Sequence, residues 1–297
     1  MDKKTLNPLL ISSLKLTAKS WIAINANSGE CFASYNEHER REMASLTKIM
    51  TAYTSLQIIN GLDINMTESL IEVSFDASLI KGTTANLSEG DVLNIYDMLH
   101  AMLLPSGNDA AYALAEYFGL ILIELGFKGS LNPVQVFVNE MNRNAKILGM
   151  FDTNYANPHG LQNFYNKSSA YDIAKLARSV MKFSLFAEIV KKQYYSCLGS
   201  DILDKQKIFR WTNTNKLLTK GFQGLKTGIT TVAGPCLASS YKDSEANIII
   251  ILLSCKTPDL RWTETMKLKN CIIQELYPRS NTIQQDKSKH LFKKKLY

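Results

Sequence analysis

The hydrophobic pattern changes its period along the chain, from strand-like near both ends to helix-like in the middle. Residues 20–35 hold two short apolar runs around Asn27-Ser28-Gly29, which predicts a β-hairpin. Four central segments place apolar residues at i, i+3 and i+4, which predicts amphipathic helices at 91–104, 107–119, 132–150 and 171–183. After residue 205 strand-like runs return, and an amphipathic helix closes the body: the runs are 224–230, 234–241 and 247–255, and the helix is 261–277.

Strands therefore come from both ends of the chain and helices from its middle. The simplest arrangement is an α/β (α+β) fold in which one antiparallel sheet, made from both chain ends, is flanked by helices. An all-helical subdomain is expected as an insert at about residues 60–190. We expect an N-terminal segment at 1–17, one main domain at 18–277 and a basic C-terminal tail at 278–297.

Composition limits the classes of function. The 297 residues are 45% hydrophobic and 21% charged, which is ordinary for a soluble globular protein. The net charge of +7 raises the question of nucleic-acid binding, but the tail KSKHLFKKKLY holds much of the excess. A solvated basic tail explains that charge, so no nucleic-acid partner is expected. The run IIIILL at 248–253 is too short to cross a bilayer and predicts a buried strand, so no transmembrane segment is expected.

Cysteine and histidine spacing gives no sign of a metal site or cofactor. The five cysteines are scattered, odd in number and never arranged as C-x-x-C, which predicts neither a zinc site nor a disulfide framework. At the N-terminus, Asn7, Pro8, Ser12 and Ser13 interrupt the apolar residues, so the start is a poor secretory signal.

The stretch EMASLTKIMTAY, residues 42–53, predicts a core helix with Ser45 at its start and Lys48 three residues later. Residues three apart share one helix face, so the amine lies within reach of the hydroxyl. A serine at a helix start also presents its own N–H group to developing negative charge. The alternative is an N-cap serine beside a snorkelling lysine. The same S-x-x-K spacing recurs at Ser12, Ser78, Ser179 and Ser239.

Two further segments carry polar groups where the chain turns or forms an edge. In LLPSGNDA, residues 103–110, Pro105 and Gly107 predict a tight turn that exposes Ser106 and Asn108, although such residues are also common N-caps. GLKTGIT, residues 224–230, is the only K-[ST]-G in the chain, and a mid-strand glycine indicates close approach to the backbone. Its cation, hydroxyl and open edge suit an extended peptide that ends in a carboxylate. The alternative is an ordinary edge strand with an exposed lysine.

In this order, S-x-x-K, S-x-N and K-T-G match the signature of penicillin-binding proteins and class A β-lactamases. Over most of 18–277 the sequence resembles the low-molecular-weight D-alanyl-D-alanine carboxypeptidases, penicillin-binding serine peptidases with a β-lactamase/transpeptidase-like fold. SGN instead of SDN, and no E-x-x-L-N between 140 and 190, favour the carboxypeptidase branch over the β-lactamases. The segments that carry the resemblance are ASLTKIMTAY, AMLLPSGNDAAYALAEY, NPHGL, SSAYDIAKLA, TNKLL and GLKTGITTVAG.

The resemblance implies a role for each motif residue. Ser45 would attack the substrate carbonyl with Lys48 as its base, and Ser106 would relay the proton to the leaving amine. Asn108 would hold the substrate backbone. The terminal carboxylate would bind Lys226 and Thr227, and Gly228 would admit the peptide. The oxyanion hole would be the N–H groups of Ser45 and Ile229.

The implied substrate is a peptide ending in D-Ala-D-Ala, and β-lactams would be covalent inhibitors. Two alternatives remain: another serine acyl hydrolase on the same fold (a β-lactamase, an esterase or a D-aminopeptidase), or a catalytically silent peptide-binding homologue. We interpret His159 of NPHGL as structural and His100 as a satisfied core histidine. The family is extracytoplasmic, whereas this N-terminus is a poor signal, so the sequence leaves the compartment open.

Overall fold

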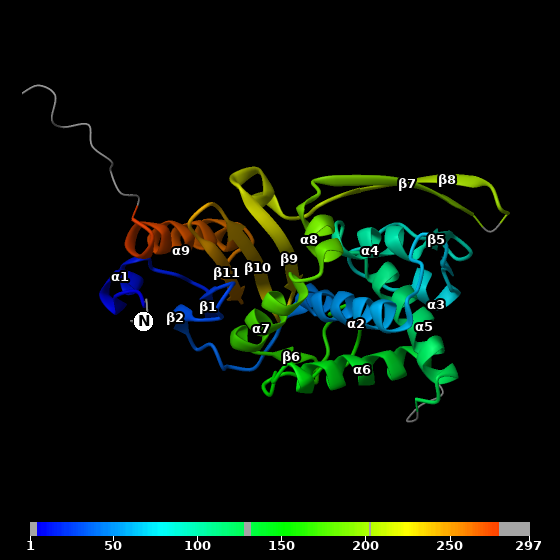
Figure 1. Ribbon diagram of the computed structural model, residues 1–297, viewed down its shortest axis with the longest axis horizontal. Helices are drawn as coiled ribbons and strands as arrows, with labels where there is room; N and C mark the ends of the chain where they lie inside the picture. The colour runs from blue at the N-terminus through cyan, green and yellow to red at the C-terminus, as the bar shows by residue number, and fades with distance from the viewer. Residues whose placement is uncertain (1–4, 128–131, 202, 279–297) are drawn as a thin grey trace, which may run out of the picture.

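A five-stranded antiparallel sheet and a mainly helical region form the molecule (Figure 1). This computed structural model describes residues 5–127, 132–201 and 203–278. The strand order is β2-β1-β11-β10-β9. The strands come from both ends of the chain: β1 (Ser20–Asn25), β2 (Cys31–Tyr35), β9 (Phe222–Thr230), β10 (Gly234–Lys242) and β11 (Asn247–Leu253). The predicted hairpin and the predicted α/β fold class are confirmed.

The central strand β11 is buried on both faces, which explains its unbroken apolar sequence. Ile248, Ile250 and Leu252 pack in a core with α9 (Leu260–Leu276) on one side of the sheet. The alternate residues of β11 belong to a larger core shared with the helical region. A strand with a side-chain period of two thus supplies both cores.

The N-terminal segment joins the α9 side of the sheet. Asn7 accepts a hydrogen bond from the Leu9 N–H and caps α1 (Pro8–Ser13). Leu6 is buried in the α9 core, and its N–H donates to the Phe32 carbonyl.

The helical region is built around α2 (Thr47–Leu62), whose first ten residues are all buried. A helix that is surrounded on every side belongs in the centre of a core, and Figure 1 shows α2 between α4 and α6. The other helices of this region are α3 (Phe75–Ser78), α4 (Ile95–Leu103), α5 (Asn108–Glu124), α6 (Pro133–Ile147), α7 (Ala170–Val180) and α8 (Ser184–Lys191). The four predicted central helices correspond to α4, α5, α6 and α7.

The expectation of an all-helical insert is wrong. Residues 60–190 include β4 (Leu70–Glu72) and β5 (Val92–Asn94), which join β7 (Tyr194–Ser200) and β8 (Gln206–Thr212) in a second sheet of order β4-β5-β7-β8. A further two-residue pair links β3 (Arg41–Glu42) with β6 (Lys167–Ser168). Strands of two or three residues are too short to show alternation.

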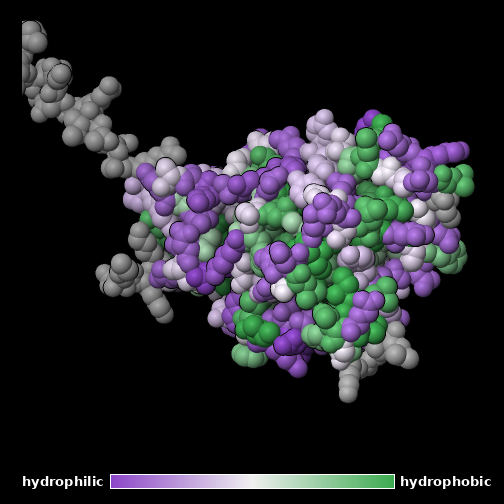
Figure 2. All heavy atoms as spheres, turned by 45° about the vertical axis from the view of Figure 1, so that its right-hand side comes forward, coloured by the Kyte–Doolittle hydropathy of each residue, from purple (hydrophilic) through white to green (hydrophobic). Residues whose placement is uncertain are grey.

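The long β7–β8 hairpin was missed for a different reason. It projects along one side of the helical region (Figure 1) and exposes large apolar side chains, Leu198 opposite Ile208, on its outer face. These residues blur the polar-out alternation that marks a half-buried strand. Figure 2, in which the right-hand side of Figure 1 is turned forward, shows apolar areas (green) between hydrophilic ones (purple) on this face of the molecule.

Two short 3₁₀ turns complete the described elements: η1 (Ala44–Leu46) precedes α2, and η2 (Lys216–Lys220) precedes β9. Across the described ranges, no helix has the length and apolar character needed to cross a bilayer. Apart from residue 278, the predicted basic tail lies outside the described residues.

Candidate active site

Ser45 and Lys48 are held together at the start of α2. Lys48 lies in the first turn of the helix, is fully buried, and places its Nζ 3.0 Å from the Ser45 Oγ. Ser45 itself lies in η1 and not in the α-helix that the sequence predicts. The preceding Ala44 has a left-handed φ of +49°, an uncommon conformation for a non-glycine residue. The predicted pairing of hydroxyl and amine is therefore present, on a tighter turn than expected.

A glycine of the NPHGL loop makes this turn possible. A Cβ placed on Gly160 would lie 2.0 Å from the Ala44 carbonyl oxygen, so only glycine permits the contact. The same loop supplies the His159 carbonyl, which accepts a hydrogen bond from Lys48 at 2.7 Å. The loop and η1 thus fix each other in front of α2.

Three oxygens surround the Lys48 Nζ. The Asn108 Oδ1 lies 2.6 Å away, in addition to the His159 carbonyl and the Ser45 hydroxyl. The Asn108 Nδ2 donates to the Lys81 carbonyl, which settles that its Oδ1 faces Lys48. Two of the three oxygens only accept, whereas the serine hydroxyl also donates. A neutral Lys48 can therefore give two N–H groups to the acceptors and keep its lone pair for the serine proton.

Electrostatics favour this neutral form. Burial lowers the pKa of Lys48 well below its usual value, and the charge of Lys226 lowers it further, whereas Asp109 acts in the opposite direction. Burial and the neighbouring Arg261 lower the pKa of Lys226 to about 7. The cleft thus contains two buried amines that give up their protons more easily than ordinary lysines.

The SGN segment lies at the turn between α4 and α5, as the sequence predicts, but the predicted exposure of its side chains is wrong, because Ser106 and Asn108 are both buried. Ser106 is buried and has a left-handed φ of +69°, a strained conformation of the kind that concentrates at functional sites. The Thr83 hydroxyl donates to the Ser106 carbonyl, and the Asn108 N–H donates to the Thr83 carbonyl. Residues 81–83 therefore hold both predicted site residues of this turn.

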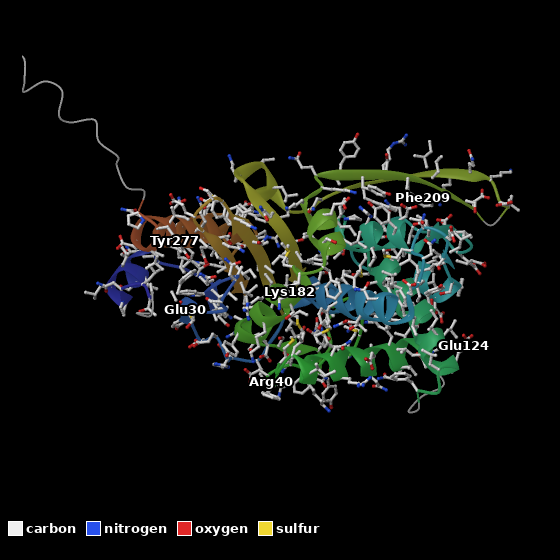
Figure 3. All side chains as sticks on the ribbon, viewed as in Figure 1. Glu30, Arg40, Glu124, Lys182, Phe209 and Tyr277 are labelled. Atoms are coloured by element: carbon white, nitrogen blue, oxygen red, sulfur yellow. The ribbon has the colours of Figure 1, made fainter. Side chains whose placement is uncertain are left out.

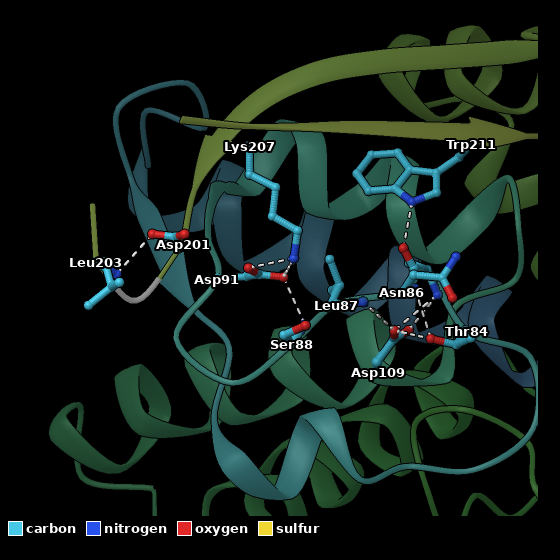
Figure 4. Close-up of polar contacts among 11 residues, drawn as sticks. Thr84, Asn86, Leu87, Ser88, Asp91, Asp109, Asp201, Leu203, Lys207 and Trp211 are labelled. Atoms are coloured by element: carbon cyan, nitrogen blue, oxygen red, sulfur yellow. Dashed lines mark hydrogen bonds and ion pairs between the residues drawn. The ribbon is translucent and has the colours of Figure 1, made fainter. Parts of the chain in front are cut away.

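Asp109, which the sequence analysis did not single out, organises the loop that supports this turn (Figure 4). Its buried carboxylate accepts from the Thr84 hydroxyl and from the backbone N–H groups of Ala85 and Leu87. The Trp211 indole of β8 donates to the Ala85 carbonyl at 2.9 Å, which ties the hairpin to the same loop. Asp109 adjoins Asn108 in sequence, and this position is the only signal that could have found it.

The KTG strand lies directly against η1. A Cβ on Gly228 would lie 3.1 Å from the Ser45 backbone nitrogen and 3.0 Å from the Met43 carbonyl oxygen. Lys226 is buried, and its Nζ donates to the Thr227 carbonyl at 3.1 Å. Ile229 follows on the same strand, half exposed. Asn108 of the SGN segment contacts Lys48 and Gly228 of the KTG strand lies against Ser45, so the three motifs meet at the Ser45–Lys48 pair, which the sequence could only assume.

Two more residues join β9 to its surroundings. The Thr214 hydroxyl lies 2.7 Å from the Thr227 hydroxyl, and the Thr214 N–H donates to the Leu104 carbonyl, so Thr214 bridges the KTG and SGN segments. It opens the family-like TNKLL segment, a signal that could have singled it out. Arg261 of α9 donates to the Gly228 carbonyl at 3.0 Å and brings a positive charge near Lys226. No motif marks Arg261 in the sequence.

His159 and His100 make structural contacts. The His159 Nδ1 accepts from the Leu161 N–H within its own loop, and burial together with the charge of Lys48 lowers the His159 pKa to about 3. His100 is buried, bonds to the Tyr96 carbonyl and stacks on Tyr195, and burial lowers its pKa to about 4. Both imidazoles are thus neutral and engaged. No three His, Cys, Asp or Glu side chains in the described ranges gather closely enough to hold a metal ion.

Known structures share this fold. The DD-transpeptidase of Streptomyces K15 superposes with a TM-score of 0.79 at 29% identity, covering 86% of this chain and 97% of that protein. The D-alanyl-D-alanine carboxypeptidase DacD of Francisella tularensis superposes with a TM-score of 0.78 at 25% identity, covering 92% of this chain and 73% of that one. The fold is that of the DD-peptidases and transpeptidases, as the resemblance implied.

Sequence comparison identifies the family. The family model described as D-alanyl-D-alanine carboxypeptidase matches residues 7–257, and the chain belongs to that family of serine peptidases. It is 30% identical to the carboxypeptidase DacF of Bacillus subtilis, over 94% of this chain and 69% of that protein. It is also 30% identical to DacD of Escherichia coli, over 86% of this chain and 62% of the relative. The chain thus spans roughly two thirds of the length of these relatives.

Proposed function

We propose that this protein is a serine-type D-Ala-D-Ala carboxypeptidase that removes the C-terminal D-alanine from peptidoglycan-type peptides and binds penicillin. The observation that carries the proposal is the buried Lys48 amine, 3.0 Å from the Ser45 hydroxyl and held by two acceptor-only oxygens. Family membership supports the choice of substrate. We assign the catalytic domain to residues 18–277.

In the proposed reaction, the Ser45 Oγ attacks the carbonyl carbon of the penultimate D-alanine while its proton passes to the Lys48 lone pair. The bond from that carbon to the terminal D-alanine nitrogen then breaks, which leaves an ester on Ser45. The Ser106 hydroxyl gives its proton to the departing amine and takes in return the proton that Lys48 received from Ser45. Water finally hydrolyses the ester and releases the shortened peptide.

Binding of the substrate would use the edge of β9. The peptide adds to this strand beside Gly228, so that its terminal carboxylate meets Lys226 and Thr227. Arg261 supports this end through the Gly228 carbonyl and its own charge. Asn108 holds the substrate amide, and the N–H groups of Ser45 and Ile229 donate hydrogen bonds to the developing oxyanion.

The test is release of D-alanine from diacetyl-Lys-D-Ala-D-Ala, together with covalent labelling by fluorescent penicillin. We expect turnover and an adduct on Ser45, and neither in Ser45→Ala. Ser78→Ala is the matched control, because Ser78 and Lys81 share the S-x-x-K spacing but the Ser78 hydroxyl donates to its own helix, to the Phe75 carbonyl. That variant keeps full activity.

Other outcomes would point to the alternatives. Hydrolysis of a nitrocefin-like lactam much faster than of the peptide would identify a β-lactamase on this fold. Peptide binding with neither an adduct nor released D-alanine would identify a silent homologue. Either result would remove the carboxypeptidase proposal.

A further inference from the structure

A cavity outside the catalytic cleft lies where β3 pairs with β6. Its volume is about 470 Å³, within the range of about 300–1,000 Å³ typical of ligand pockets. Arg40 precedes β3 and lies at the same end of the molecule as β6 (Figures 1 and 3). The residues that line the cavity are Arg40, Asn154, Phe164, Tyr165 and Lys167.

The lining combines aromatic faces with hydrogen-bond donors. Phe164 and Tyr165 are 71% and 70% exposed, so two adjacent aromatic rings are open to solvent at the cavity. Their rings stand nearly perpendicular, with centroids 5.3 Å apart, and form a corner. The Lys167 ammonium lies 4.1 Å from the Phe164 ring centroid. Arg40 and Lys167 only donate hydrogen bonds. The lining is therefore complementary to a ligand with apolar C–H faces and oxygen acceptors around its rim.

The loop that carries the two rings is fixed in place. The Asn154 side-chain amide donates to the Tyr165 carbonyl at 2.8 Å. Asn166 is buried, and its Nδ2 donates to the Thr47 hydroxyl at the start of α2. The corner is thus anchored one residue away from Lys48, which gives the cavity a defined position relative to the cleft.

The cavity lies within reach of a peptide bound in that cleft. A peptide whose carboxylate meets Thr227 and whose scissile carbonyl meets Ser45 continues past Ile229. The Met43 carbonyl, one residue after β3, would lie 3.0 Å from a Cβ on Gly228, so the chain that leaves β3 lies against β9. Arg40 is five residues from Ser45, hence at most about 18 Å away, a distance that about five extended residues of a bound peptide span.

We propose that this cavity is a glycan subsite: it binds an N-acetylated hexosamine ring of the polymer whose stem peptide occupies the cleft. The inference rests on the proposed function, because it extends the same substrate. The sugar lays its C–H face on Phe164 or Tyr165, and its hydroxyl and acetamido oxygens accept from Arg40 and Lys167. The preferred substrate is then a stem peptide still attached to its sugar.

Binding tests this without turnover. In the Ser45→Ala protein, calorimetry compares a stem peptide ending in D-Ala-D-Ala and linked to an N-acetylhexosamine disaccharide with the same peptide in free form. We expect the linked ligand to bind about tenfold more tightly, and the added pair Phe164→Ala and Tyr165→Ala to remove that advantage. Both side chains are exposed, so the variant should keep its melting temperature. Phe151→Ala is the matched control: this aromatic is 83% exposed, also beside a lysine, but outside the cavity.

Equal affinity for the two ligands, or an advantage that survives the double substitution, would overturn the glycan subsite. The Ser45-containing enzyme separates this result from the proposed function. Release of D-alanine from the free peptide without any glycan advantage removes the subsite alone. A glycan advantage in binding without any D-alanine release removes the carboxypeptidase proposal alone.

Discussion

The partly buried Lys207 and the fully buried cleft lysines, Lys48 and Lys226, have different kinds of partner. Beneath the β7–β8 hairpin, the Lys207 Nζ donates to both oxygens of the buried Asp91, at 2.8 and 2.6 Å (Figure 4). In the cleft, the Lys48 Nζ lies within hydrogen-bond distance of three uncharged oxygens, and Lys226 donates to a carbonyl. A carboxylate partner favours the charged form of a lysine, whereas burial among neutral acceptors near a second cation favours its neutral form.

The Asp109 carboxylate shows how this difference is maintained. It is close enough to Lys48 to raise the Lys48 pKa, yet its oxygens accept from the Thr84 hydroxyl and from several backbone N–H groups. The hydrogen bonds of this carboxylate are therefore made with the supporting loop and not with Lys48. Lys48 keeps a neutral hydrogen-bond environment although an acid is near.

The largest expected effect comes from removing the base. Lys48→Met keeps the length of the side chain and loses its lone pair, and we expect acylation by fluorescent penicillin to fall by about 10³-fold or more. The melting temperature should stay about the same or rise, because burying an amine that has no ion-pair partner costs folding free energy. Acylation within tenfold of the wild-type rate would show that Ser45 uses another base.

A smaller effect is expected where the lysine is structural. Lys207→Met leaves the Asp91 carboxylate buried with the Ser88 N–H as its remaining donor, and we expect a loss of about 2 kcal/mol in the free energy of unfolding. Urea unfolding measures this. Lys205→Met, an exposed lysine on the same hairpin, is the control and should change stability by less than about 0.5 kcal/mol. Equal effects of the two substitutions would contradict the structural role of the pair.

The smallest expected effect is a pH dependence of the free energy of unfolding that comes from Lys226 and not from an exposed lysine. The Lys226 pKa is about 7 in the folded protein and about 10.4 when unfolded, so between these values the native state binds fewer protons. Burial of the charged Lys226 therefore lowers the free energy of unfolding by its full amount below pH 7. This loss of stability shrinks as pH rises toward 10.4, at most by about 1.4 kcal/mol per pH unit.

The stability gap between Lys226→Met and the wild type should therefore narrow by about 1 kcal/mol from pH 7 to pH 8. Urea unfolding at the two pH values measures it, and the exposed Lys216→Met is the control that should show no such change. A gap that stays constant over this interval would mean that Lys226 titrates like an ordinary lysine.

The sequence predicted those parts of the site in which chemistry and spacing coincide. The three motifs and the fold class follow from residue order and periodicity, and the structure brings Ser45, Lys48 and Asn108 into contact. The assigned roles stay predictions. The insert was predicted less well, because β4 and β5 are three residues long and join the rest of their sheet only where β5 pairs with β7, about a hundred residues away.

Arg261 and Thr214 show what a linear sequence hides. Each acts on β9 through one contact with a distant element, and neither stands in a local pattern that names its partner. The 3₁₀ geometry at Ser45 likewise depends on Gly160, more than a hundred residues away. Such features belong to tertiary packing, and spacing along the chain does not encode them in a readable form.

The double burial of β11 links catalysis to the end of the chain. Because alternate residues of this strand belong to two cores, detachment of α9 would expose one face of the strand on which β10 and, through it, β9 are assembled. The same detachment would withdraw Arg261 from the Gly228 carbonyl. Loss of the last helix and loss of the substrate-binding edge should therefore occur as one cooperative event, so that the protein has no stable partly folded form with an intact cleft.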